Sequence, residues 1–221
     1  MKKIKLNLGC GSVRPDGWIN SDSSLNAHLQ RVPLIGKKLA KTINNVVYLS
    51  NNVIYINLNK KWKYKDNSVD IVYASHLFEH LTLRSADLFL AESFRCLKPG
   101  GIIRIVIPDL CKICRQYLRD YDDPSIVDPT KFIMWAINMH REGQYGTNIN
   151  IFKKAILEWQ GYPHQHKFMY DDKSLSLKIK SAGFEHIYSL TYGESKFITE
   201  VKDVEGTVES YLSVYIEAKK P

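Results

Sequence analysis

Histidine and carboxylate side chains gather in one short stretch, at His76, Glu79 and His80. Imidazole titrates near neutral pH, so a histidine beside a substrate hydroxyl is suited to accept its proton. His76 is the best candidate for such a base, because it lies immediately beyond a predicted buried strand over residues 69–74. Glu79 lies within one helical turn and is placed to orient an imidazole. His80 reads equally well as a second base or as a helix-start histidine bonded to backbone.

Further candidates for acid–base chemistry follow later in the chain. Asp109 comes after a predicted strand over residues 101–107, and its carboxylate either binds an acceptor or caps the next helix. We favour the cap. His140, His164 and His166 are further candidate bases. They reach the site only if the segment that carries them folds over it.

A single Cys-x-x-Cys pair, Cys111 and Cys114, deserves comparison with a metal site. Together with His164 and His166 it would supply four zinc ligands. Both cysteines, however, lie within a predicted helix over residues 110–121, and their spacing does not resemble a zinc knuckle. We therefore expect cysteines packed as small hydrophobic side chains, and no metal.

Ligand binding by backbone groups is indicated near the amino terminus. A predicted strand over residues 3–8 ends in the turn Leu8-Gly9-Cys10-Gly11. Glycine accepts positive φ at little cost and lets a backbone approach a ligand closely. At the carboxyl end of a buried parallel strand, such a turn lines the crevice that holds nucleotide-like ligands.

The elements that must position these residues alternate between strands and helices, which predicts a parallel sheet with right-handed crossovers. The last strand alternates apolar and polar residues, as an antiparallel strand with one exposed face does. Predicted strands cover residues 3–8, 18–22, 53–57, 69–74, 101–107, 186–191 and 209–218, and predicted helices cover residues 82–97, 110–121 and 172–182.

Four motifs occur in an order that resembles the class I S-adenosylmethionine (SAM)-dependent methyltransferases. They are LNLGCGS, GWINSD, DNSVDIVYASHLFEHL and LKPGGIIRIVIPDL. The resemblance covers residues 3–110 and, more loosely, residues 164–184. It is closest to the small, methyltransferase type 11-like group often linked to bacterial surface-sugar clusters. It implies an α/β, Rossmann-like fold with a seven-stranded, mostly parallel sheet, an antiparallel C-terminal strand and helices on both faces.

The resemblance also implies which residues hold SAM. Backbone groups of the turn Leu8–Gly11 should face its amino-acid end, and Ser75, His76 and Leu77 should border the methionine part and the sulfonium. The Asp22 carboxylate should accept both ribose hydroxyls, unless it is only a solvated turn residue. Asn57-Leu58 stand where the family usually has an acidic residue that meets the adenine amine. The carbonyl oxygen of Asn57 can accept that hydrogen bond instead.

Positive charge is concentrated in the first third of the chain. Residues 1–65 hold twelve Lys and Arg but only two acidic residues, in a chain of formal net charge +8. This indicates an acidic partner or simply a well-solvated basic surface, which we favour. The segment Lys60–Lys65 alternates lysines with aromatic residues, which is typical either of a base-stacking surface or of a solvated loop with tucked rings.

We expect one domain over residues 1–221, with insertions near residues 24–50 and 122–168. Residues 122–168 concentrate aromatic residues and histidines, so we interpret that insertion as a substrate wall rather than decoration. No apolar run approaches the ~20 residues of a membrane-spanning helix. The chain has neither a recognisable signal peptide nor a disulfide framework, and we expect a cytoplasmic protein.

The leading interpretation is SAM-dependent methyl transfer to a small-molecule or carbohydrate-linked acceptor, perhaps one that bears phosphate. An RNA or DNA methyltransferase is an alternative that we do not favour, since no nucleic-acid module is recognisable. A SAM-binding scaffold or sensor without activity is the alternative from a different class, because a fold alone does not determine function.

Overall fold

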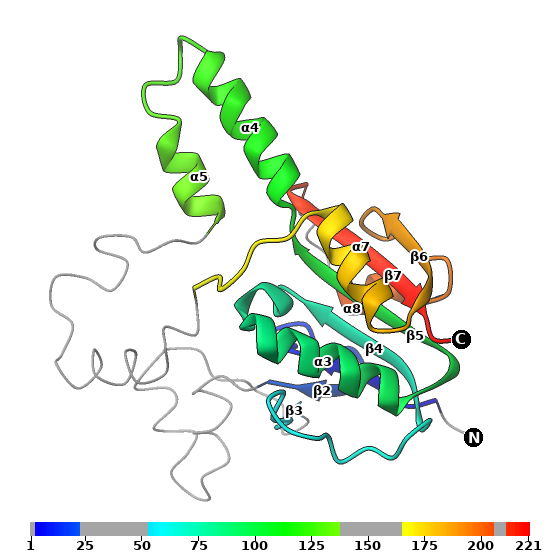
Figure 1. The fold of residues 1–221 in the computed structure, drawn as a ribbon. Helices are drawn as coiled ribbons and strands as arrows, with labels where there is room; N and C mark the ends of the chain where they lie inside the picture. Colours follow the sequence, from blue (N-terminus) through cyan, green and yellow to red (C-terminus); the bar gives the residue numbers. More distant parts are fainter. Residues whose placement is uncertain (1–2, 23–52, 138–164, 206–210) are drawn as a thin grey trace, which may run out of the picture.

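The predicted strands form one seven-stranded sheet in the order β3-β2-β1-β4-β5-β7-β6 (Figure 1). They span Lys5–Leu8 (β1), Ile19–Ser21 (β2), Val53–Ile54 (β3), Val69–Ser75 (β4), Leu97–Pro108 (β5), Glu185–Leu190 (β6) and Ser213–Lys219 (β7). This is a computed structural model, and it describes residues 3–22, 53–137, 165–205 and 211–221.

Strand directions follow the Rossmann-like pattern. β1 pairs in parallel with β2 and β4, β2 pairs in parallel with β3, and β4 pairs in parallel with β5. β7 lies between β5 and β6 and is antiparallel to both. The predicted fold class is confirmed. Because parallel strands end at the same edge, the turns after β1, β2, β4 and β5 meet there.

Alternating residues of the central strands face two separate hydrophobic cores. On one face, α3 (Leu83–Cys96) and α7 (Asp172–Ser181) contribute Phe89 and Leu175 to the larger core. Figure 1 shows both helices in front of the sheet. The short helix α8 (Val201–Glu205) packs on the opposite core. Helices therefore cover both faces, as expected.

β7 differs from its predicted exposure. Its polar positions Ser213, Tyr215 and Glu217 alternate as expected, yet all three are buried. The reason lies in long-range contacts that the alternation does not reveal. Glu217 accepts hydrogen bonds from Arg104 on β5 and from Ser195 in the loop after β6. The second face of β7 is thus covered by polar partners.

The predicted helices α3 and α7 begin with the expected capping chemistry. The Thr82 side chain accepts from the Ser85 N–H before α3, and Asp171 and Ser174 form a capping box before α7. α3 ends at Cys96, one residue earlier than predicted. β5 begins directly afterwards, ahead of its predicted start.

Three short elements were not predicted: the 3₁₀ turn η1 (Phe78–His80), α5 (Thr130–Ala136) and α8. Each has only one or two turns, too few for a periodic pattern. α4 (Leu110–Asp122) was predicted, and with α5 it shares a small third core. The expected insertion at residues 24–50 lies outside the described residues. Of the insertion at residues 122–168, only the two ends are described.

Within the part of the chain that the structure describes, the helices are all too short or too polar to cross a bilayer.

Candidate active site

The turn after β1 has the backbone geometry that its glycines allow. Gly9 has φ +67° and Gly11 has φ +49°, values that favour glycine. A Cβ on Gly9 would lie 3.1 Å from Leu77, so the turn packs directly on the segment after β4. Among the described residues, a Cβ on Gly11 would meet no atom within 4 Å. The space beside Gly11 is therefore open to a ligand, which fits the expected SAM site.

Asp22 lies against the same turn, just after β2. Its carboxylate accepts a hydrogen bond from the Gly11 N–H at 3.1 Å. The Cys10 N–H donates to the Ser21 carbonyl at 2.9 Å. The Cys10 side chain is buried, and burial raises the pKa of its thiol to about 11. Cys10 is thus placed to contribute backbone rather than thiol chemistry, as the sequence indicates.

Asn57 and Leu58 lie beyond the end of β3. The Asn57 side-chain oxygen accepts a hydrogen bond from the Asn59 N–H at 2.9 Å, which forms a local turn. Leu58 packs partly against the larger core. An adenine contact through Asn57 therefore has to share this oxygen with the turn, and it stays a prediction.

His76 follows Ser75, the last residue of β4, at the sheet edge shared with the glycine turn. Its φ is +49°, in the left-handed region that few residues other than glycine adopt, although histidine, asparagine and aspartate do so more often than most. The backbone N–H donates to Val106 at 2.9 Å, and the imidazole is 44% exposed. Its Nε2 lies 3.2 Å from the Ser213 hydroxyl, and its Nδ1 lies 3.4 Å from Glu79 Oε1.

Glu79 is the centre of a histidine cluster. Its side chain is 1% exposed, and the Nε2 atoms of His80 and His166 each lie 3.9 Å from its Oε1. The His80 and His166 rings meet edge to face, with centroids 4.9 Å apart. Four of the predicted catalytic residues, His76 included, are thus brought together around one carboxylate.

His166 reaches this cluster because the segment before α7 is tied to η1. The backbone N–H groups of Lys167 and Phe168 both donate to the Glu79 carbonyl, at 2.7 and 3.3 Å. Burial lowers the pKa of His166, against the opposing effect of the Glu79 charge. Its imidazole is therefore held mainly in the neutral form near pH 7. His140 and His164 lie outside the described residues.

Asp109 is a helix cap. Its side chain accepts hydrogen bonds from the Cys111 and Lys112 N–H groups at the start of α4. Burial raises the pKa of its carboxyl, although these hydrogen bonds oppose the shift. The arrangement agrees with the favoured interpretation from the sequence. A contact with an acceptor stays a prediction.

The structure bears on two other expectations, the tucked rings of residues 60–65, which it agrees with, and the packing of the Cys-x-x-Cys pair. Trp62 and Tyr64, from the basic and aromatic segment, pack in or against the larger core, with Trp62 edge to face on Phe89. Their rings are thus not displayed for base stacking. Cys114 is exposed, so it is not packed as a small hydrophobic side chain. It lies on an exposed side of α4, whose one buried residue is Ile113.

Sequence reasoning missed Ser213, whose hydroxyl contacts His76. It lies on β7, 137 residues away, and a serine in a strand carries no local signal. Leu77 was expected only to border the ligand, yet it also supports the glycine turn. Both contacts depend on strand order rather than on spacing.

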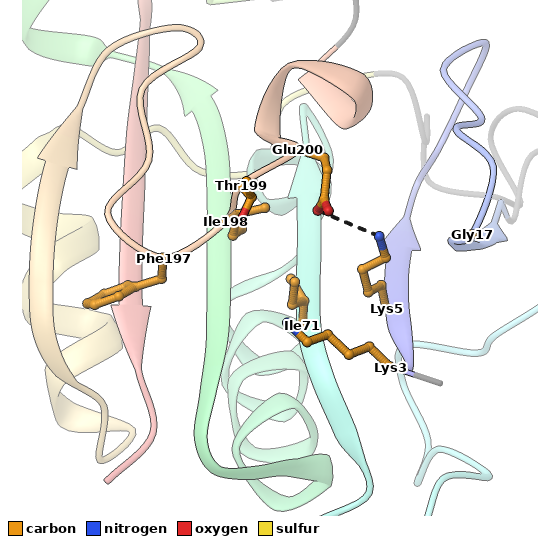
Figure 2. Close-up of a pocket in the computed structure, with 8 residues that line it drawn as sticks. All are labelled: Lys3, Lys5, Gly17, Ile71, Phe197, Ile198, Thr199 and Glu200. Carbon is orange, nitrogen blue, oxygen red and sulfur yellow. Dashed lines mark ion pairs between the residues drawn. The ribbon is translucent and has the colours of Figure 1, made fainter. Parts of the chain in front are cut away.

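A separate hollow of about 200 Å³ lies on the α8 side of the sheet (Figure 2). Lys5 of β1 faces Glu200 across it, at 3.9 Å between Nζ and Oε2. Lys3 and Ile71 also line it. Its lining shares no residue with the predicted site, so we assign it no part in methyl transfer.

Comparison with known proteins supports a methyltransferase domain in this chain. A family model described as a methyltransferase domain matches residues 6–105. The search of curated proteins finds no significant match.

Solved structures share the fold at low sequence identity. A SAM-dependent methyltransferase from Archaeoglobus fulgidus is 15% identical, with 99% of this chain and 87% of that chain covered and a TM-score of 0.51. One from Methanosarcina mazei is 16% identical, with 100% and 93% covered and a TM-score of 0.47. The first likeness supports the fold, and the domain match supports the activity.

Proposed function

This chain is a SAM-dependent methyltransferase, and we propose that it methylates a hydroxyl group of a small-molecule or carbohydrate-linked acceptor. One observation carries the proposal. A half-exposed imidazole, His76, is held at positive φ directly after β4, beside the open glycine turn. Strained residues of this kind are concentrated at functional sites.

The cofactor would lie along the sheet edge formed by the ends of β1, β2 and β4. In this proposal the backbone of Leu8–Gly11 faces its amino-acid end, Asp22 accepts the ribose hydroxyls, and Asn57-Leu58 border the adenine. Ser75 and His76 lie nearest the sulfonium. Bound SAM supplies an electrophilic methyl group, so the protein contributes chiefly position and proton transfer.

His76 would accept the proton of the acceptor. As a lone pair of the hydroxyl oxygen forms the new bond to the methyl carbon, the bond from that carbon to sulfur breaks. The hydroxyl proton passes to the imidazole. The buried Glu79 carboxylate, 3.4 Å from Nδ1, orients the ring, and the Ser213 hydroxyl contacts Nε2. A general base of this kind contributes about 10²–10⁴-fold.

The class of acceptor follows from the resemblance and from the surface of the described residues. The burial of Trp62 and Tyr64 removes the feature that most favoured nucleic acid. The link to carbohydrate comes from the type 11-like motifs alone. A noncatalytic scaffold would not need a strained, half-exposed histidine at the site.

The test compares His76→Ala with His186→Ala. His186 is a matched control, because it is exposed and also has positive φ, at +48°, but lies on β6. Binding of S-adenosylhomocysteine is measured by calorimetry. Methyl transfer from labelled SAM is measured with nucleotide sugars, sugar phosphates, phenols and short RNA.

We expect both variants to bind S-adenosylhomocysteine like the unaltered protein. Turnover should fall at least about 100-fold in His76→Ala alone. Full turnover in His76→Ala would show that His76 is not the base. Transfer to RNA alone would overturn the acceptor class.

A further inference from the structure

We propose that Glu79, His80 and His166 bind a divalent transition-metal ion, with Zn²⁺ as the first ion to test. Their ligand atoms all lie within 4.8 Å of one another. Imidazole and carboxylate are the ligands that such ions take in mixed nitrogen and oxygen sites. The inference goes beyond methyl transfer, although Glu79 also orients His76 in the proposed function, and it departs from the expectation from sequence that the chain holds no metal.

The first argument is the state of the Glu79 carboxylate. The side chain is 1% exposed, and neither of its oxygens accepts a hydrogen bond from any described residue. A buried carboxylate without such partners is costly, and a bound cation removes that cost. The carboxylate points into the group of histidines rather than toward solvent, since all its recorded ion-pair contacts are with imidazoles.

The second argument is the protonation of the two imidazoles. His80 Nδ1 lies 3.2 Å from the Gln165 carbonyl, and His166 Nδ1 lies 3.2 Å from the Met169 sulfur. A carbonyl only accepts, so the His80 Nδ1 carries the proton. The His166 ring also bonds the backbone of Ile137, and the proposal places its proton on Nδ1, toward the Met169 sulfur. In a neutral ring, Nε2 then has a free lone pair. Both Nε2 atoms face Glu79 Oε1, so three electron-pair donors converge with no proton between them.

This tautomer is the one that metal-binding histidines use. A ligating imidazole commonly donates its other N–H to a backbone carbonyl, as His80 does to Gln165. A carboxylate that binds a metal usually also accepts a hydrogen bond from a neighbouring group. The Nδ1 of His76, 3.4 Å from Glu79 Oε1, is placed to donate one. The surroundings therefore resemble the outer partners of a metal centre.

Metal binding requires the three side chains to draw together. Both Nε2 atoms lie 3.9 Å from Oε1, and the three ligand atoms lie within 4.8 Å of one another. Two ligands of a tetrahedral zinc ion, each about 2.1 Å from the metal, lie about 3.4 Å apart. Side-chain rotation therefore has to shorten the two Nε2–Oε1 distances by about half an ångström and the widest separation by up to about 1.4 Å. Three protein ligands leave a coordination position open, which is typical of catalytic rather than structural zinc sites.

The test is zinc binding by the full chain, purified in the presence of chelator and dialysed. Calorimetric titration with Zn²⁺ gives the stoichiometry and affinity, and visible absorption of bound Co²⁺ reports the ligand geometry. The variants are Glu79→Gln, His80→Ala and His166→Ala. Two control variants remove other side chains that could bind Zn²⁺. They are His186→Ala and the double variant Cys111→Ser with Cys114→Ser. Circular dichroism confirms that each variant is folded.

We expect one Zn²⁺ per chain, with affinity at least tenfold weaker in each variant of the three ligands and unchanged in both controls. Glu79→Gln keeps the shape of the side chain, so weaker Zn²⁺ binding by this variant reports the lost carboxylate rather than a loss of structure. Two results would overturn the proposal: no stoichiometric binding by the folded protein, or binding that depends on the cysteines instead. In the first case a shared proton, rather than a metal, holds the cluster together. Because no acceptor or SAM is present, these results are independent of the methyl-transfer assay.

Discussion

At the scale of single residues, Asp22 is the side chain on which cofactor affinity should depend most. It is the acidic residue that lies against the glycine turn. We predict that Asp22→Ala weakens SAM binding by roughly 1–3 kcal/mol, the usual cost of losing a charge-assisted hydrogen bond. Calorimetry measures the change. Asp16→Ala, an exposed acidic residue of the same loop, is the control. Equal affinities for the two variants would remove Asp22 from the cofactor site.

Gly11 allows the open space beside the turn to be tested directly. Gly11→Ala adds a Cβ that meets no protein atom, at a φ of +49°. Gly17→Ala is matched, because Gly17 also has positive φ, at +78°, and its nearest neighbour is 4.0 Å away. Each variant should lose about 1–2 kcal/mol of unfolding free energy from backbone strain. Only Gly11→Ala should also weaken SAM binding. If neither variant binds SAM more weakly than the unaltered protein, the cofactor does not approach this backbone.

At the scale of elements, α3 holds the loop before β4 through the Glu92–Arg95 pair. Glu92 accepts from the Arg95 guanidinium at 2.6 and 2.9 Å and from the Trp62 N–H at 2.6 Å. The hydrogen bond from Arg95 is the largest cause that lowers the pKa of the Glu92 carboxyl below its ordinary value of 4.5. The ionised form is therefore favoured in the folded state.

This pair predicts acid sensitivity. A carboxyl with a lowered pKa contributes stability above its unfolded value, and that contribution is lost as pH falls through the folded pKa. Unfolding free energy should thus decline from about pH 5 downward. Glu92→Gln should be about 1–3 kcal/mol less stable at pH 7 and show a shallower decline. Urea denaturation at several pH values measures both. Parallel curves for the variant and the unaltered protein would contradict the assignment.

At the scale of the whole molecule, sequence reasoning succeeded where a signal is local. The strands, the glycine turn and the grouping of His76, Glu79 and His80 all follow from spacing within one element or turn. It named the distant His166 only as a candidate whose place depended on the fold, and it missed Ser213. His166 reaches Glu79 through backbone bonds across the fold, and Ser213 reaches His76 through strand order. The pattern of apolar residues carries no information about either contact.

The same limit applies to the opposite face of the sheet, where Arg104, Glu205 and Glu217 form a buried ion-pair cluster. Arg104 is fully buried, donates to Glu205 at 2.7 Å and contacts Glu217 at 3.3 Å. The cluster joins β5 to α8 and β7, whose glutamates lie 101 and 113 residues further along the chain. The alternation along β7 looks like that of a strand with one exposed face, which is why the sequence predicted exposure there.

Removal of Arg104 should therefore affect the whole fold rather than one element. Arg104→Ala leaves two carboxylates buried without their cation, and breaking a buried pair in this way costs about 3–5 kcal/mol. Arg115→Ala removes an exposed arginine of α4 and should change stability by less than about 0.5 kcal/mol. Urea denaturation at pH 7 compares the two. If both variants unfold at the same urea concentration, the cluster does not hold β7 and α8 on the sheet, and apolar packing alone accounts for their attachment.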